Sequence, residues 1–414
     1  MMKKLLLIIF LLSGLSASSQ TFNREQYRED FNYFWTSIND NYCYFEKKHI
    51  TWADLKPGYD KQIDTITSRN SFVATIEKVF YELYDHHCSL GTNTPLSRRL
   101  VPTSADIWAE YTNGKPVITE LRKGFGAEQA GIKAGMEVIA VDDVPVNKAI
   151  LPYLGRVINA ESKSFALRLL LAGNHIAKRK FTLKTKSGLS DFFPDRDSVM
   201  LEHVAYPAMV EAKEFGAIGY IRINNFLFDN ALIPKFDSVL NTLLQKKAII
   251  IDLRETPSGG NTAVARSILG RFISKDNFYQ KHELYAEEKE TGIKRSWVEI
   301  VSPRGITYTK PLVTIADHWT GSISEGITIA FDGMKRATII GTQLARLNGA
   351  VESYRMPNSK IGFNFTTERL YHINSTPREQ FNPTITVDVT TQKPGNDVIL
   401  NTALDFLRHK ISTK

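Results

Sequence analysis

The sequence is poor in several features that define large classes of proteins. Its 414 residues include only two cysteines, Cys43 and Cys88, which excludes a disulfide-dense scaffold and a cysteine-based zinc site. One bridge between them and two reduced thiols are both compatible with their spacing. No apolar run approaches the roughly 18 residues that a stable transmembrane helix needs, so we expect no membrane span.

Charge and histidine patterns exclude further classes. The formal net charge is +8, but Lys and Arg are scattered along the chain, so we expect no nucleic-acid partner. The nine histidines lack the H-x-x-x-H spacing of metal sites, and we expect neither a metal nor another cofactor. A G-x-S-x-G elbow is missing, which argues against an α/β-hydrolase such as an esterase.

The first residues carry the pattern of a secretory signal peptide. Lys3 and Lys4 precede an apolar stretch at 5–12, and small residues follow at 17–19. We therefore expect residues 1–19 to be removed and the mature protein to be exported to a periplasm or to the extracellular space. No cysteine follows the apolar stretch, so a lipid anchor is not expected.

The rest of the chain divides into regions of different periodicity. Residues 22–98 place aromatic and aliphatic side chains at helical spacing, which predicts an N-terminal helical region whose first helix is capped by Asn23. Residues 104–188 contain short β patterns. Residues 212–393 alternate strands with helices, which is typical of a mainly parallel sheet covered on both faces. Residues 397–414 predict a closing helix, so the predicted fold class is α/β combined with β.

The β-rich region contains a recognisable string of glycines and apolar residues. Residues 126–146 predict a short helix, a glycine turn, a strand and a tight Asp-Asp turn. This string resembles the core of a PDZ domain. The residues that match are Ala130, Gly131, Ile132, Gly135, Ile139, Val141 and Asp142. The resemblance implies a PDZ-like domain over 104–188, whose groove would bind a peptide terminus as an added β-strand.

The segment 319–326 joins a predicted buried strand at 311–316 to a predicted helix at 327–334. Ser322 thereby stands at a helix N-terminus, where free backbone N–H groups and the helix dipole favour negative charge. An acyl-transfer enzyme needs this arrangement, because the nucleophile must lie beside oxyanion donors. Taken by itself, the turn favours a plain N-terminal cap. Other motifs along the chain reverse that preference.

Two further motifs accompany the serine turn. Residues 251–260 end a predicted strand in a glycine-rich loop that can direct several N–H groups toward one anion, and residues 339–341 read Ile-Ile-Gly. The glycine-rich loop, the serine turn and the Ile-Ile-Gly strand follow one another in the sequence after the PDZ-like region. In this order they resemble the motifs of the tail-specific (C-terminal processing) serine peptidases and their tricorn-like relatives, peptidase family S41. The resemblance covers most of residues 75–393. It implies an α/β peptidase core that acts on peptides or unfolded proteins.

The resemblance also assigns roles within the serine turn. Ser322 matches the nucleophile, because it lies three residues before the motif glutamate Glu325. Ser324 falls on a second serine of the motif, which we expect to be structural. The implied oxyanion donors are the backbone N–H of Ile323 and one N–H of the glycine-rich loop, for which Gly259 is favoured.

The general base separates two branches of the family. The processing branch places a lysine in a G-x-x-T-x-G-K-G stretch, but the matching position here is Leu347, and Arg346 cannot replace it because a guanidinium stays protonated. The tricorn-like branch uses a histidine in a D-G-H-like motif. Residues 85–87 read Asp-His-His, which assigns the base to His87 with His86 as the alternative.

The resemblance to the tricorn-like branch also implies a glutamate late in the core. Glu379 is the closest match and Glu368 the alternative, and a carboxylate there could orient the site or the substrate. The glycine-rich loop departs from the family pattern, with Glu255 and Thr256 where Asn is common. The prediction is therefore an exported Ser–His peptidase, and the alternative is a pseudopeptidase that binds peptides without cutting them.

Overall fold

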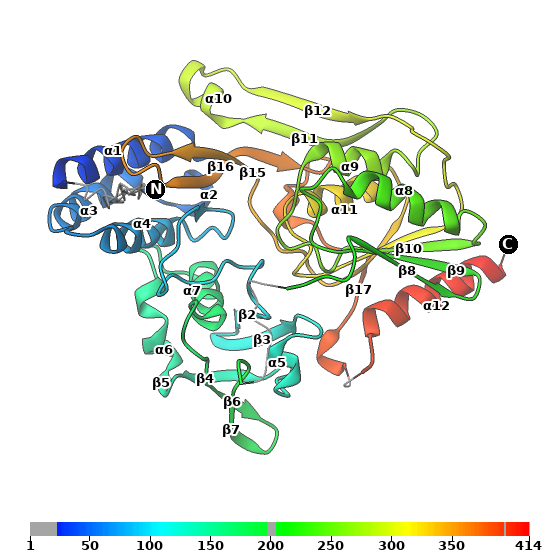
Figure 1. The fold of residues 1–414 in the computed structure, drawn as a ribbon, viewed down its shortest axis with the longest axis horizontal. Helices are drawn as coiled ribbons and strands as arrows, with labels where there is room; N and C mark the ends of the chain where they lie inside the picture. Colours follow the sequence, from blue (N-terminus) through cyan, green and yellow to red (C-terminus); the bar gives the residue numbers. More distant parts are fainter. Residues whose placement is uncertain (1–22, 197–203, 393–394, 414) are drawn as a thin grey trace, which may run out of the picture.

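The computed structural model describes residues 23–196, 204–392 and 395–413. The expected signal peptide at 1–19 lies outside the described residues. The predicted mixture of helices and sheets is confirmed: within these described ranges, three sheets of five, six and six strands accompany the helices (Figure 1). None of the helices in the described part of the chain combines the length and apolar character that a membrane crossing requires.

The N-terminal region is a group of helices. The elements are α1 (Arg24–Asn41), α2 (Phe45–Lys48), η1 (Trp52–Leu55), α3 (Lys56–Ile63) and α4 (Arg69–Leu83). Asn23 caps α1 reciprocally with Gln26, as the sequence predicts, and each bonds the other's backbone N–H. The aromatic stripes form the core of this region, where the rings of Trp35 and Trp52 stack with centroids 4.1 Å apart.

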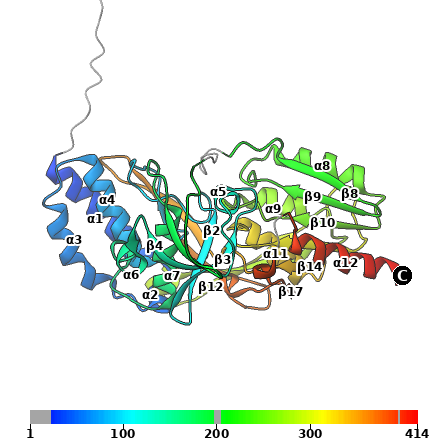
Figure 2. The same ribbon diagram turned by 90° about the horizontal axis from the view of Figure 1, so that it is seen from below.

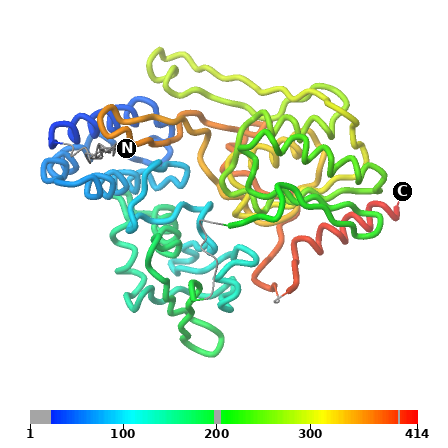
Figure 3. Tube along the Cα trace, in the orientation of Figure 1, coloured from blue at the N-terminus to red at the C-terminus, as the bar shows by residue number. Residues whose placement is uncertain are grey.

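An antiparallel sheet connects these helices to the rest of the molecule. Its strands are β1 (Ser89–Leu90), β16 (Gly362–Tyr371), β11 (Asn277–Leu284) and β12 (Arg295–Val301), in that spatial order, with β15 (Ala350–Arg355) also paired to β16. Helix α10 (Tyr285–Thr291) joins β11 to β12. The orange segment of β15 and β16 therefore reaches the blue N-terminal helices, although the two are far apart in the sequence (Figure 3). The sequence patterns did not indicate this second sheet within 212–393.

A separate antiparallel sheet covers most of residues 104–188. The strands are β2 (Ile107–Thr112), β3 (Lys115–Leu121), β4 (Glu137–Val141), β6 (Phe181–Thr185) and β7 (Gly188–Phe192), in that order, with the short β5 (Val144–Pro145) on β4. Helices α5 (Gly126–Gln129), α6 (Val146–Ala149), η2 (Leu151–Tyr153) and α7 (Ala160–Ala172) fill the connections. Strand β2 is at the edge of this sheet, and α7 packs against it.

The third sheet has the order β17-β14-β13-β10-β9-β8. The strands are β8 (Val210–Phe215), β9 (Ile218–Ile223), β10 (Ala248–Asp252), β13 (Leu312–Ala316), β14 (Thr338–Gly341) and β17 (Ile385–Thr386). All neighbours pair in parallel except β8 and β9, which are antiparallel. The four strands expected from apolar runs are β9, β10, β13 and β14.

Helices cover both faces of this sheet. Helices α8 (Leu232–Leu243), α9 (Thr262–Leu269) and α11 (Ile323–Gly333) share one apolar core with it. Helix α12 (Val398–Ser412) packs on the other face. In the sequence, the short 3-10 helix η3 (Arg378–Gln380) precedes β17, and the 3-10 helix η4 (Val389–Thr391) follows it. Because parallel strands end at the same edge, the loops after β10 and β13 meet there, and these loops carry the two site motifs.

Both loops also touch the sheet that contains β2 and β3, which lies beside them (Figure 2). The buried Trp319, three residues before Ser322, donates its indole N–H to the carbonyl of Ala105, 2.8 Å away. Arg122, just after β3, donates its Nε–H to Glu255 at 3.0 Å in the glycine-rich loop. The position of the sheet that contains β2 and β3 is therefore linked to both site loops.

Candidate active site at the Ser322 turn

Ser322 is the N-terminal cap of α11 and has an unusual backbone conformation. Its φ of 54° and ψ of −113° are rare for a residue with a Cβ and are typical of strained turns at functional sites. The backbone N–H of Ser322 donates to Glu325 Oε2 at 2.8 Å, which fixes the turn. Its Oγ lies 3.1 Å from Nε2 of His87, a residue distant in the sequence.

His87 occupies a short turn between α4 and β1. Its backbone N–H donates to Asp85 Oδ1 at 3.0 Å, an Asx turn of the kind that Asp favours. The other oxygen of Asp85 accepts from the hydroxyl groups of Tyr42 and Thr366, at 3.0 and 3.2 Å. The turn is thus held by a buried carboxylate, and the imidazole lies between Ser322 and the carbonyl of Asn348.

The contact with Asn348 determines the tautomer of His87. Nδ1 lies 2.6 Å from the Asn348 carbonyl oxygen, which can only accept a hydrogen bond. Nδ1 therefore carries the proton of the neutral ring, and Nε2 presents a lone pair to Ser322. Burial, with help from the nearby charge of Arg378, lowers the pKa of His87 to about 4, against the opposing effects of the Asn348 bond and of Asp85. The ring is neutral near pH 7.

The glycine-rich loop after β10 lies against the serine turn. Thr256 N–H donates to the Trp319 carbonyl at 3.2 Å, and Gly321 N–H donates back to the Thr256 carbonyl at 3.3 Å. Gly259 has a φ of +68°, and a Cβ there would overlap Ser322 Cβ and approach Ile323 N within 3.3 Å. Only glycine fits at this place without moving the serine turn.

The first turn of α11 supplies the backbone donors of the site. Ile323 is the first residue of the helix, so its N–H has no partner within the helix. Ser324 is fully buried, and its hydroxyl donates to the carbonyl of Gly321 at 2.8 Å. Ser324 thus stabilises the turn through a contact that does not involve His87.

Arg378 is a central contact of the site that sequence reasoning missed. It is 2% exposed, and its guanidinium donates to three loop carbonyls. These belong to Ser322 at 3.3 Å, Leu347 at 3.0 Å and Gly349 at 2.6 Å. It also lies 3.8 Å from Glu325, whose pKa burial raises to about 7 although Arg378 opposes the rise. One side chain therefore connects the nucleophile turn to the loop that carries Asn348.

The structure separates the two candidate histidines. His86 Nε2 accepts from Arg168 Nε at 3.0 Å, and its ring packs on Phe165 with centroids 4.4 Å apart. Burial lowers the pKa of His86 well below its ordinary value. His86 is therefore part of the packing around α7, whereas His87 contacts Ser322.

The two candidate glutamates occupy different places. Glu379 follows Arg378 in η3 and accepts from Lys47 at 3.4 Å, while its Oε2 is buried without a partner among the described residues. Glu368, on β16, accepts from His282 at 2.9 Å. Of the two, Glu379 shares a cavity of about 450 Å³ with Asn348, the residue whose carbonyl bonds His87.

The residues that depart from the family motifs make identifiable contacts in the structure. Glu255 is buried and accepts from Arg122 and from the hydroxyl of Tyr206, which lies 2.7 Å away. Thr256 forms the link to the serine turn described above. Leu347 is buried, and its side chain comes close to Gly321. The two cysteines are free buried thiols.

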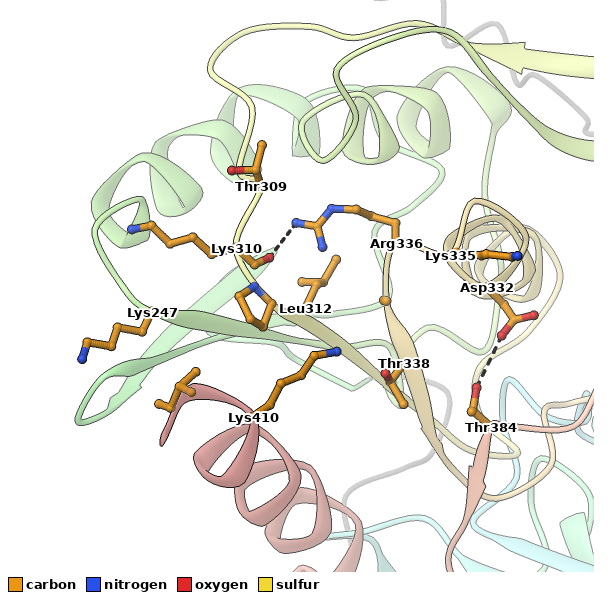
Figure 4. A pocket seen from close by; sticks show the side chains of 13 residues that line it. Lys247, Thr309, Lys310, Leu312, Asp332, Lys335, Arg336, Thr338, Thr384 and Lys410 are labelled. Carbon is orange, nitrogen blue, oxygen red and sulfur yellow. Dashed lines mark hydrogen bonds between the residues drawn. The ribbon is translucent and has the colours of Figure 1, made fainter. Parts of the chain in front are cut away.

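A larger cavity, of about 840 Å³, lies away from these residues (Figure 4). Its lining includes Leu312 and Thr338, which begin β13 and β14, so it opens at the amino-terminal edge of the sheet. Its basic residues include Lys310 and Arg336, whose side chains donate to backbone carbonyls. Ser322 stands at the opposite, carboxyl-terminal edge. Within the described residues, no group of His, Cys, Asp and Glu is arranged to hold a metal ion.

Two regions of the chain match models of known protein families. Residues 217–390 match peptidase family S41, and residues 23–80 match the tricorn protease C1 domain. The chain therefore resembles the peptidases of family S41 over that core region. The chain is 24% identical over 318 residues to a carboxyl-terminal-processing protease of Synechocystis sp., an alignment that spans 74% of this chain and 68% of that protein.

Solved structures show the same fold. The chain resembles mature CPAF complexed with lactacystin, with a TM-score of 0.61 and 13% identity over 94% of this chain and 98% of that chain. It also resembles the photosystem II D1 C-terminal processing protease, with a TM-score of 0.55 and 16% identity over 88% of this chain and 93% of that one. At these identities the structural comparisons establish the fold alone.

Proposed function

We propose that this protein is a peptidase of the S41 type, which cleaves peptide bonds with Ser322 as the nucleophile and His87 as the general base. The observation that carries the proposal is the 3.1 Å separation of Ser322 Oγ from His87 Nε2, together with the bond from His87 Nδ1–H to Asn348. A base must lie within hydrogen-bonding reach of the proton it removes and must hold a free lone pair. His87 meets both conditions.

The reaction begins when Ser322 Oγ attacks the substrate carbonyl carbon while its proton passes to His87 Nε2. The carbonyl oxygen becomes an oxyanion, and His87 then gives its proton to the leaving amine as the C–N bond breaks. The acyl group remains on Ser322 as an ester. Water then attacks this ester with His87 again as the base, and the acid product leaves while Ser322 regains its proton. In each cycle the Asn348 carbonyl holds the imidazole in place and stabilises its charged form.

The oxyanion would be bound by backbone N–H groups on two sides. Ile323 N–H lies at the start of α11, where the helix dipole adds to the donor. The second donor comes from the glycine-rich loop, where Gly259 packs against Ser322 and Ile323. Removing a single oxyanion donor from a serine peptidase costs about 10²–10³ in kcat, so this contact is a major part of the proposed chemistry.

Glu379 is assigned to substrate positioning. Its buried Oε2 has no partner within the described chain, and Glu379 lines the cavity that also contains Asn348. A carboxylate of this kind can accept a backbone N–H of the bound peptide. The PDZ-like region at 104–188 would bind a peptide terminus, and export would follow from the pattern of residues 1–19.

Ser322→Ala tests the proposal directly. The wild-type protein should hydrolyse fluorescein-labelled casein and be labelled by a serine-directed phosphonate, and the variant should lose labelling and at least about a thousandfold in kcat. Alanine carries the same Cβ through the same strained turn, so the melting temperature should change little. If the wild-type protein binds casein but neither cleaves it nor reacts with the phosphonate, it is a pseudopeptidase and the proposal fails.

A further inference from the structure

The cavity of about 840 Å³ at the amino-terminal edge of the parallel sheet gathers basic side chains from separate parts of the chain. Ile249 of β10 pairs with Leu312 of β13, so Lys247 and Lys310, each two residues earlier, reach the same edge of the sheet. The last turn of α12 adds Lys410 from another layer. The lining contains one carboxylate, that of Asp332, and five cationic side chains: Lys247, Lys310, Lys335, Arg336 and Lys410. The cavity therefore concentrates positive charge that is otherwise scattered along the sequence.

The cations of this cavity are not neutralised by carboxylates. None of the five forms an ion pair with a residue that the structure describes. The side chains of Lys310 and Arg336 donate to backbone carbonyls at 2.6–3.2 Å, those of Leu244, Gln245, Phe272, Tyr308 and Lys310. Burial lowers the pKa of Arg336, but a guanidinium keeps its charge at any pH near neutrality. The two fixed cations thus contribute a positive potential without a counterion.

The one carboxylate of the lining has other partners. Asp332 accepts from the hydroxyl of Thr384 at 3.4 Å and lies 3.2 Å from Nε2 of His372 (Figure 4). Neither contact involves a lysine or an arginine of the cavity. Asp332 therefore does not serve as the counterion of the five cations.

Three lysines remain free to contact a ligand. Lys247, Lys335 and Lys410 are exposed, and their ammonium groups have no hydrogen-bond partner among the residues that the structure describes. Figure 4 shows Lys410 extending from α12 toward Leu312 and Thr338, with Lys247 and Lys335 on different sides of the opening. A lysine has a flexible four-carbon stem, so each of the three can turn toward an anion in the cavity.

We propose that this cavity binds a ligand that carries two or more phosphate groups. The guanidinium of Arg336 is occupied by carbonyls, so the free cations are lysines, which bind phosphate as point charges and lack the planar fork that favours carboxylates. A phosphate offers several acceptor oxygens to such donors. More than one phosphate is required, because the free lysines stand apart around a cavity large enough for a small-molecule ligand.

The proposed phosphate site is distinct from the proposed catalytic site. Ser322 stands at the carboxyl-terminal edge of the sheet, whereas the cavity opens at the amino-terminal edge. Two sources can supply the same chemistry, a soluble oligophosphate or the phosphate headgroups of a lipid surface. Binding is therefore measured with one probe for each source.

Isothermal titration calorimetry of the full-length protein with sodium tripolyphosphate tests the site. The wild-type protein should bind about one tripolyphosphate per chain. The double variant Lys335→Met, Lys410→Met should raise Kd at least about tenfold, because two charge-assisted contacts are lost while the apolar stems remain. The matched control is Lys115→Met, Lys184→Met, which removes the same charge from exposed lysines of β3 and β6 that form no ion pair with a described residue. The control should change Kd less than about twofold.

Cosedimentation with vesicles distinguishes the two sources. Sedimentation with phosphatidylglycerol–phosphatidylcholine vesicles, but not with phosphatidylcholine alone, identifies lipid headgroups if the Lys335, Lys410 variant loses it and the control variant keeps it. Tripolyphosphate binding without sedimentation identifies a soluble ligand. If neither probe binds, or if the two double variants weaken binding equally, the protein responds only to net charge and the proposal is wrong. Neither measurement depends on the activity of Ser322.

Discussion

Gly259→Ala offers a sharp test of the proposed oxyanion site. Gly259 adopts a φ of +68°, and an added Cβ would overlap Ser322 Cβ and lie 3.0 Å from Ser322 Oγ. It would also come within 3.3 Å of Ile323 N, tighter than an ordinary contact. The methyl group would therefore occupy the space between the two sets of proposed oxyanion donors.

The expected magnitudes differ for folding and for catalysis. A residue with a Cβ in the left-handed region costs about 1–2 kcal/mol relative to glycine, which is a modest part of the typical 5–15 kcal/mol that stabilises a domain. Displacing one oxyanion donor costs about 10²–10³ in kcat. We therefore expect Gly259→Ala to remain folded and to lose at least about a hundredfold in kcat.

The control is Gly292→Ala. Gly292 has a φ of +72°, close to that of Gly259, but a Cβ there would meet no atom within 4 Å. Both variants should lose free energy of unfolding in urea, Gly259→Ala the more because its Cβ would overlap Ser322 Cβ, and only Gly259→Ala should lose casein hydrolysis. If Gly259→Ala keeps more than about a third of the wild-type kcat, or if Gly292→Ala loses as much activity, the reasoning about this loop is wrong.

The other predictions concern charge near the same turn. Burial lowers the pKa of His87 to about 4, and only the neutral ring can accept the Ser322 proton, so kcat/KM should fall as the pH drops through about 4 instead of through the ordinary 6.5. A pH–rate profile whose acid limb has its midpoint near 6.5 would contradict this environment. Arg378→Met should lower the free energy of unfolding by about 3–5 kcal/mol, because it leaves buried Glu325 without its cation. A urea-measured loss below about 1 kcal/mol would show that Arg378 does not hold the two loops together.

Local sequence patterns were sufficient to predict many of the strands and helices of the fold. The apolar runs at 217–223, 248–253, 312–316 and 337–340 correspond to β9, β10, β13 and β14, and Asn23 caps α1 as expected. These features depend on residues close together in the chain, so periodicity and capping chemistry reveal them. The antiparallel sheet of β11, β12, β15 and β16 was not predicted, because the pairings of β16 with β11 and with β1 join residues distant in sequence and its strands lack long apolar runs.

The features of the candidate site also separate into those that the sequence predicts and those that it does not. The strand–turn–helix around Ser322 and the glycine at 259 are local features, and the resemblance to S41 peptidases pointed to His87. The bond from His87 to Asn348 goes to a backbone carbonyl, which every residue possesses, so no side-chain type could signal it. Arg378 is equally hidden, because nothing in its neighbourhood of the sequence shows that it is buried among three loop carbonyls.

The amino-acid sequence by itself determined which segments form strands and helices and which residue types stand at the serine and glycine turns. Tertiary structure decided which groups meet: Ser322 with His87, Asn348 with the imidazole, and α7 with the edge of β2. The physical reason is that secondary structure follows from interactions over a few residues. A catalytic contact requires several loops to be fixed to within about half an ångström by the packing of whole sheets.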